Sequence, residues 1–377
     1  MSNDILPAES NLTTPGFHQP PLEHHPKMDE SVRRRIQRDG IFGLGETYEQ
    51  GLWSTAHLNE YMDQVFTAPA PRLTPFVWAR LILGALDKRI FNRQAGRGAF
   101  NIGEKHYDLG NDLFRSMLDS SMSYTSGYWA SADTLEQAQE AKLDLICRKL
   151  SLQPGQHILD IGCGWGNFAE HAARNYGARV TGVTVSKEQA AFARNRCADL
   201  PVDIRLQDYR EVDELFDHVV SIEMIEAVGR KNLPNYYSVV DRCLSEGGLF
   251  VLQVISGNTL TRTSDRRLDQ YILWLVRNIF PDGYLPRADE LVPPRNTDLR
   301  IVDWHRYDDD YNQTLLAWAA RFNENWAQIA DQYDERFYRR WNFYIHGCAA
   351  MFRAQLIDVN QLVYTKGKTS TRFEPVR

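Results

Sequence analysis

The stretch HILDIGCGWGNF, residues 157–168, decides the fold of this 377-residue chain. An apolar run, HILDI, leads into Gly162, Gly164 and Gly166, and residues typical of a helix follow. Glycines at such a turn let the backbone approach a ligand closely, and the start of the next helix offers free N–H groups. The stretch therefore predicts a strand, a ligand-binding loop and a helix in that order. The alternative is a glycine turn that only packs a helix on a strand.

Strand-like and helix-like segments alternate after this loop. The segments are ARVTGV, a helix through EQAAFARNRC, VDIRL, HVVSI, a helix through NYYSVVDRCL, LFVLQVI and, near the end of the chain, QLVYT as a final strand. This alternation is typical of right-handed βαβ units. The predicted fold class is therefore α/β, with a mostly parallel sheet and helices on both faces.

Two ligands fit a glycine loop of this kind: a dinucleotide, or S-adenosylmethionine. A dinucleotide fingerprint reads GxGxxG and is followed by an acidic residue about twenty positions later. Here the spacing is GxGxG, and the second strand ends at Thr184, followed by Val185 and Ser186. The run DIGCGWG, in which Asp160 closes the strand, instead resembles the first motif of class I S-adenosylmethionine-dependent methyltransferases. The loop therefore favours that cofactor.

The composition excludes several other classes of protein. A formal net charge of −6 argues against a protein that binds nucleic acid by neutralising phosphates. No window reaches the roughly 18 apolar residues needed to cross a bilayer, and the start MSNDILPAES lacks the pattern of a secretory signal. The five cysteines form no CxxC pair, which argues against a zinc site. We therefore expect a cytoplasmic protein without a metal.

The chain before the glycine loop predicts a separate region. Residues 1–28 are rich in Pro, Asn, His and Glu, and we expect a disordered tail. Residues 29–97 show apolar residues at helical spacing and predict a small helical domain, with the polar stretch 93–100 as a linker. Residues 98–377 then form the catalytic domain, which contains a mainly helical insertion at about 256–298.

From about Gly40 to the C-terminus the chain resembles the cyclopropane-fatty-acyl-phospholipid synthases and the related mycolic acid cyclopropane synthases. The motifs that carry the resemblance are GLGETYEQGLW, EKHYDLGNDLFRSMLD, LDIGCGWG, GVTVSKEQ, LQDYR, IFPDGYLP and AWAARF. The resemblance implies a seven-stranded, Rossmann-like methyltransferase sheet. It also implies methylation of double bonds in the acyl chains of membrane phospholipids, with a cyclopropane as the product.

The resemblance also implies which residues hold the cofactor. It places Tyr124 and Thr125 over the cofactor, Gly162 and Gly164 at its methionine part, Thr184 and Gln189 at the ribose, and Asp208 and Tyr209 at the adenine.

Two carboxylates, Glu223 and Glu226, stand in the otherwise apolar run SIEMIEAVG. The resemblance implies that Glu226 holds a bicarbonate ion, which removes a proton to close the ring. The groups around that ion are implied to be the backbone amide of Ser126, Gln253, the backbone of Ile255, and Tyr311. The resemblance assigns no role to Glu223, and we expect it to be a structural charge at the start of a helix.

Two of these positions depart from the family pattern. Ser126 stands where the family has Cys, which matters little if only the backbone N–H is used. Gln253 stands where the family has His, and an amide cannot take up a proton. A His that commonly follows the carboxylate is here Ala227. The product is therefore either a cyclopropane or a methyl- or methylene-branched chain, and a lipid- or cofactor-binding protein without activity is a third alternative.

A lipid substrate implies peripheral contact with the inner face of the membrane, and the family suggests a homodimer. Two regions are candidates for the membrane contact: the helical N-terminal domain, and the segment YILWLVRNIF with Arg262, Arg266 and Arg267 nearby. The alternative for the second region is burial as a lid over the acyl chain.

Overall fold

The computed structural model describes residues 26–68, 74–79, 110–257, 265–281, 283–367 and 373–377. Most of the predicted tail at 1–28 and the predicted linker at 93–100 lie outside the described residues, as does Arg262. The boundary between the two predicted domains therefore remains a prediction.

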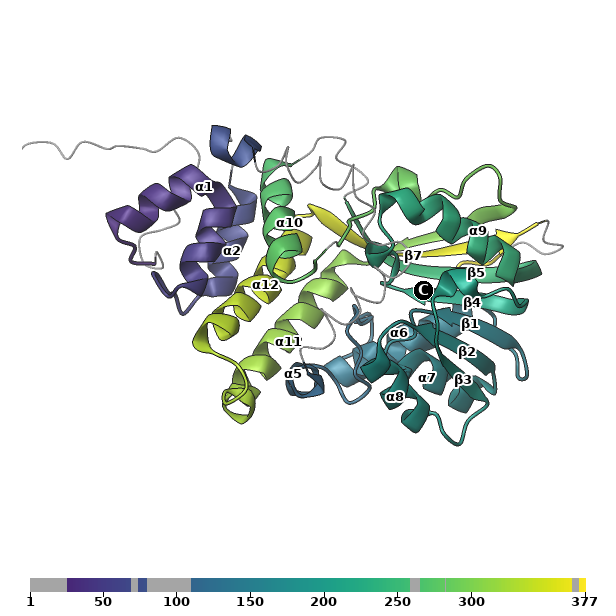
Figure 1. The fold of residues 1–377 in the computed structure, drawn as a ribbon. Helices are drawn as coiled ribbons and strands as arrows, with labels where there is room; N and C mark the ends of the chain where they lie inside the picture. Colours follow the sequence, from purple (N-terminus) through teal and green to yellow (C-terminus); the bar gives the residue numbers. More distant parts are fainter. Residues whose placement is uncertain (1–25, 69–73, 80–109, 258–264, 282, 368–372) are drawn as a thin grey trace, which may run out of the picture.

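A seven-stranded sheet forms the centre of the C-terminal part, in the order β3-β2-β1-β4-β5-β7-β6 (Figure 1). The strands are β1 (His157–Ile161), β2 (Arg179–Thr184), β3 (Val202–Leu206), β4 (Phe216–Ile222), β5 (Leu244–Gly257), β6 (Leu299–Arg306) and β7 (Ile357–Lys366). Strands β1 to β5 pair in parallel, whereas β7 is antiparallel to both β5 and β6. The predicted mostly parallel α/β sheet is confirmed, and β6 is a strand that the sequence analysis did not assign.

Helices cover both faces of the sheet, because its central strands are apolar on both sides. One face carries α6 (Leu135–Lys149), α7 (Asn167–Tyr176) and α8 (Lys187–Arg196), and their apolar residues pack in one core cluster with β1 and β2. A second core cluster joins α9 (Leu233–Cys243) to β4 and β5. Thr134 and Ser186 begin α6 and α8 by accepting hydrogen bonds from backbone N–H groups of the first turn.

A third core cluster lies beside the sheet and is mostly helical. It contains α1 (Glu30–Glu49), α2 (Leu58–Thr67), α5 (Asn111–Met117), α10 (Arg266–Asn278), α11 (Asp308–Ile329) and α12 (Glu335–Arg353). Figure 1 shows α10, α11 and α12 between the two N-terminal helices and the sheet. Tyr271 and Trp274 of α10 are fully buried in this cluster. The apolar face of the segment YILWLVRNIF is therefore packed inside the protein, and its role as a lid over the acyl chain stays a prediction.

Helix α1 bends at Gly40 and is hydrogen-bonded to α10 next to the bend. Gly40 has a φ of 62°, in the left-handed region that favours glycine. The side-chain oxygen of Gln270 accepts a hydrogen bond from the backbone N–H of Ile41 at 3.0 Å. A Cβ atom at Gly40 would lie 1.9 Å from that oxygen. Close approach of α1 to α10 therefore requires glycine at position 40.

We expect Gly40→Ala to lower the unfolding free energy by roughly 2–5 kcal/mol. About 1–2 kcal/mol comes from a left-handed non-glycine residue, and about 1–3 kcal/mol from loss of the buried hydrogen bond. Gly155→Ala is the control, because Gly155 has a φ of +83° and no atom within 4 Å of its would-be Cβ. Thermal melts of both variants measure the difference, and equal losses of Tm would contradict the fastening role of Gln270.

Candidate active site

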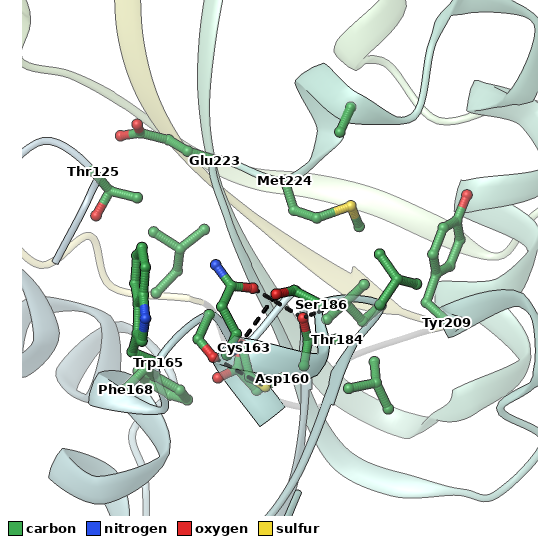
Figure 2. Close-up of a pocket in the computed structure, with 18 of the residues that line it drawn as sticks. Thr125, Asp160, Cys163, Trp165, Phe168, Thr184, Ser186, Tyr209, Glu223 and Met224 are labelled. Atoms are coloured by element: carbon green, nitrogen blue, oxygen red, sulfur yellow. Dashed lines mark hydrogen bonds between the residues drawn. The ribbon is translucent and has the colours of Figure 1, made fainter. Parts of the chain in front are cut away.

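A pocket opens at the C-terminal ends of β1, β2 and β4, where parallel strands of an open sheet place their ligand sites (Figure 2). The glycine loop forms its floor. Gly162, Gly164 and Gly166 have φ values of 81°, 54° and 81°, and α7 begins directly afterwards. A Cβ on Gly164 would meet no protein atom within 4 Å. The backbone at Gly164 therefore faces the open space of the pocket, which allows a ligand to approach it closely.

Asp160, at the end of β1, is buried beneath this loop. Its side chain is 2% exposed, and Oδ2 has no hydrogen-bond partner among the described residues. Burial raises its pKa to about 7, and the nearby Lys142 ammonium opposes this effect. An unpartnered buried carboxylate oxygen is costly unless a bound ligand satisfies it.

The end of β2 and the loop after β3 line another side of the pocket. Thr184 donates a hydrogen bond to the side-chain oxygen of Gln189 at 3.0 Å, so these two predicted residues form one unit. Tyr209 lines the pocket as well, but the carboxylate of Asp208 is already held by Arg210 through its backbone N–H at 3.0 Å and Nε at 2.8 Å. The Asp208 carboxylate is therefore occupied by a guanidinium that the sequence analysis did not consider.

Tyr124 and Thr125 line the pocket, and Figure 2 shows Thr125 at the same end as Glu223. The hydroxyls of Tyr124 and Tyr344 are hydrogen-bonded at 2.8 Å. Lys142 donates to the hydroxyl of Thr125 at 3.0 Å and is fully buried. Burial lowers the pKa of Lys142 to about 8, and attraction to Glu223 and other carboxylates opposes this effect.

The five predicted catalytic groups come together, but around two carboxylates instead of one. Glu226 accepts a hydrogen bond from the backbone N–H of Ile255 at 2.6 Å, and its Oε2 has no partner among the described residues. The backbone N–H of Ser126, the amide of Gln253 and the hydroxyl of Tyr311 all donate to Glu223.

Glu223 also does not begin a helix, as had been expected. The short 3-10 helix that follows is Ile225–Ala227, and it has no side-chain cap. The carboxylate of Glu223 instead contacts groups from three distant parts of the chain. The prediction of a helix-start charge is therefore wrong.

Two buried charges near the pocket, Lys142 and Glu223, were not predicted as site residues. For Lys142 a signal exists in the sequence. Lys142 and Lys149 fall in register with Leu135, Ala138 and Leu145, so they lie on the buried face of α6. For Glu223 the local signal is its place in the apolar run SIEMIEAVG, which does not indicate its partners, because these lie 97, 30 and 88 positions away.

No group of three His, Cys, Asp or Glu side chains in the described ranges could hold a metal ion. None of the helices in the same ranges combines the length and the apolarity needed to cross a membrane.

Comparison with known proteins shows which family this chain resembles. Residues 95–362 match the family described as mycolic acid cyclopropane synthetase. The chain is 43% identical over 336 residues to the cyclopropane-fatty-acyl-phospholipid synthase of Escherichia coli K12, which covers 89% of this chain and 85% of the relative. It is 34% identical over 351 residues to the tuberculostearic acid methyltransferase UfaA1 of Mycobacterium tuberculosis, covering 88% and 80% of the two chains.

Solved structures agree with the sequence comparison. The mycolic acid cyclopropane synthase CmaA1, crystallised with SAH and CTAB, has a TM-score of 0.67 at 33% identity and covers 71% of this chain and 98% of its own. The cyclopropane synthase MmaA2 of Mycobacterium tuberculosis has a TM-score of 0.68 at 31% identity, with the same coverage. This chain belongs to the family of the mycolic acid cyclopropane synthetases and cyclopropane-fatty-acyl-phospholipid synthases.

Proposed function

We propose that the protein is an S-adenosylmethionine-dependent C-methyltransferase that forms cyclopropanes from double bonds in phospholipid acyl chains. One observation carries the proposal. The glycine-loop pocket of a methyltransferase fold is lined at one end by Glu223, a buried carboxylate held by Ser126, Gln253 and Tyr311. Such a carboxylate suits a reaction that must remove a proton in a dry site. The activities that the relatives' names state support the same reaction.

The pocket fits the cofactor on two counts. Gly164 leaves open space where a ligand can approach the backbone, and the unpartnered oxygen of Asp160 lies beneath the loop. A cofactor that carries a sulfonium and an ammonium group suits a pocket with buried carboxylates. When bound, S-adenosylmethionine supplies a methyl group that is reactive toward an electron-rich double bond.

We further propose the roles that the resemblance implies for the pocket residues. Tyr209 contacts the adenine, and the Thr184–Gln189 pair reaches the ribose. Asp208 acts there together with Arg210, since its carboxylate is already paired. The remaining cofactor contacts lie in the part of the pocket that contains Glu223. They are made by Tyr124, Thr125, Gly162 and Gly164.

The product depends on which proton is lost after methyl transfer. Loss from the transferred methyl group closes a cyclopropane ring, and loss from the acyl chain leaves a branched chain. Either loss needs a base, which the buried carboxylate can supply without a proton carried by Gln253. We favour the ring, because the relative with 43% identity is named a cyclopropane-fatty-acyl-phospholipid synthase. An inactive homologue is disfavoured by the cluster around Glu223, since a buried charged site without a ligand only costs stability.

We propose that the N-terminal region, residues 29–97, supplies the membrane contact and that it also mediates a homodimer. Phe76 and Trp78 support the first part, because their side chains are 41% and 50% exposed. Exposed aromatic residues of this kind insert into the headgroup region of a bilayer. The aromatic face of α10 does not compete for this role, since Tyr271 and Trp274 are buried.

We expect Gly164→Ala to weaken S-adenosylmethionine binding by roughly tenfold or more, about 1.4 kcal/mol. The added methyl group occupies the open space where the ligand would meet the backbone. Isothermal titration calorimetry measures the affinity. Gly155→Ala, which places Ala at a similar positive φ far from the pocket, should bind normally, and an unchanged affinity of Gly164→Ala would contradict the cofactor site.

We expect the purified protein to consume S-adenosylmethionine with vesicles of unsaturated phospholipid and not with vesicles of saturated phospholipid. Proton NMR of the extracted lipid identifies the product, because cyclopropane protons are strongly shielded. Vinylic signals in their place would establish the branched alternative. Equal consumption with both kinds of vesicle would contradict methylation of a double bond.

We expect Phe76→Ala combined with Trp78→Ala to reduce cosedimentation with anionic vesicles at low salt several-fold, because two interfacial anchors are removed. Leu215→Ala is the control, since Leu215 is 65% exposed but lies on the sheet domain. Equal vesicle binding by both variants would place the membrane contact elsewhere.

A further inference from the structure

The carboxylate of Glu223 sits where three donors converge. Its Oε1 accepts the backbone N–H of Ser126 at 2.9 Å and the amide of Gln253 at 2.8 Å. Its Oε2 accepts the hydroxyl of Tyr311 at 2.8 Å. These are three of the groups that the family resemblance implies for an exchangeable bicarbonate. In this chain a covalently attached carboxylate uses them.

The carboxylate can still take up a proton. A carboxylate offers about four lone-pair sites, and the three donors use three of them. Oε2 has Tyr311 as its one donor among the described residues, so one site on it remains. Glu223 also lines the pocket, on the same wall as Met224 and near Thr125 (Figure 2). A proton on a ligand in the pocket therefore has an acceptor within the wall itself.

Glu223 has more groups that stabilise a negative charge than Glu226 has. Burial raises the pKa of Glu223, and the three donors and the buried ammonium of Lys142 oppose this effect without cancelling it. Glu226 has one such donor, the N–H of Ile255. Burial raises the pKa of Glu226 to about 8, and the negative charge of Glu223 adds to this shift. Three donors therefore stabilise a negative charge on Glu223, whereas one donor does so on Glu226.

The backbone at Glu223 is strained, which a mere surface charge would not require. Its φ is 50°, a value that costs a non-glycine residue roughly 1–2 kcal/mol. The backbone N–H of Glu223 donates a hydrogen bond to the carbonyl of Gln253 at 2.8 Å, which stabilises this backbone conformation. Strained residues of this kind concentrate at functional sites.

We propose that Glu223 is the catalytic base of this enzyme and that it replaces an exchangeable bicarbonate ion. The groups that would otherwise bind the ion, Ser126, Gln253 and Tyr311, are positioning residues for its carboxylate. Gln253 suits this role, because an amide donates a hydrogen bond to a carboxylate at any pH.

The inference rests on the proposed function, and the reaction balances without a further reactant. The electron pair of the acyl double bond forms a bond to the methyl carbon as its bond to sulfur breaks, which leaves a cation on the acyl chain. The Glu223 carboxylate takes one proton from the transferred methyl group, and the released C–H electron pair forms the second ring bond. The sulfur keeps the electron pair of its broken bond, so the products are S-adenosylhomocysteine, a neutral cyclopropane and a neutral Glu223 carboxylic acid, which returns its proton to water.

Two variants separate the role of the negative charge of Glu223 from the role of the volume that its side chain fills. Glu223→Gln keeps the side chain and removes the base, so turnover should fall by roughly 10²- to 10⁴-fold, as for other positioned acid–base groups. Added bicarbonate should not rescue it, because the amide still fills the site. Glu223→Gly frees the three donors and suits a φ of 50°, so it should fold normally. Its turnover should fall similarly in bicarbonate-free buffer and recover when bicarbonate is added.

Binding of ¹³C-labelled bicarbonate, followed by carbon NMR, gives a readout that does not depend on activity. The wild-type protein should show no specific binding, and Glu223→Gly should show saturable binding that acetate displaces. Calorimetry should show that all three proteins still bind S-adenosylmethionine, and turnover is then compared at saturating cofactor so that it reports on the base. Bicarbonate-dependent turnover of the wild-type protein, or near-normal turnover of Glu223→Gln, would overturn the assignment of the base. A wild-type protein that is inactive on every unsaturated lipid would instead refute the proposed function, while the bicarbonate titration would still test the site.

Discussion

A buried carboxylate needs hydrogen-bond donors in place of water. At Glu223 this requirement joins three separate elements at the pocket. Glu223 obtains its donors from the loop before α6, from the central strand β5 and from the first turns of α11. An unpaired carboxylate in this position would cost several kcal/mol. The sheet and the helical layer beside it are therefore joined at the point where the pocket needs a charge.

The other buried charges follow the same logic. Lys142 of α6 lies near Glu223, Asp119 and Asp160, so one buried ammonium partly compensates several carboxylates. Asp160 keeps one oxygen without a partner, which leaves the pocket with unsatisfied negative charge. A cationic ligand completes this arrangement. The pocket is thus stabilised by the molecule it binds, which is typical of sites that hold a charged cofactor.

The glycine loop and the alternation of strands and helices could be predicted from the sequence, because both depend on short-range patterns. The loop residues Gly162, Gly164 and Gly166 have the positive φ values that such a turn demands. The partners of Glu223 could not be predicted, since they meet only after β5 and α11 have packed. The resemblance named these donors and placed them around an ion held by Glu226, whereas three of them contact Glu223 in the structure. Strand β6 was overlooked because it forms no βαβ unit and joins the sheet through β7 in antiparallel register.

The contact between α1 and α10 makes the N-terminal helices part of the same folding unit as the pocket. A Cβ on Gly45 would lie 2.5 Å from the indole nitrogen of Trp274, so the indole ring of α10 packs directly on the backbone of α1. Trp274 packs in turn on Phe343 of α12, with ring centroids 4.8 Å apart. Opening α1 alone would expose these rings to water. Amide protons in the second half of α1 should therefore exchange with solvent as slowly as those of α12, in the same cooperative opening event.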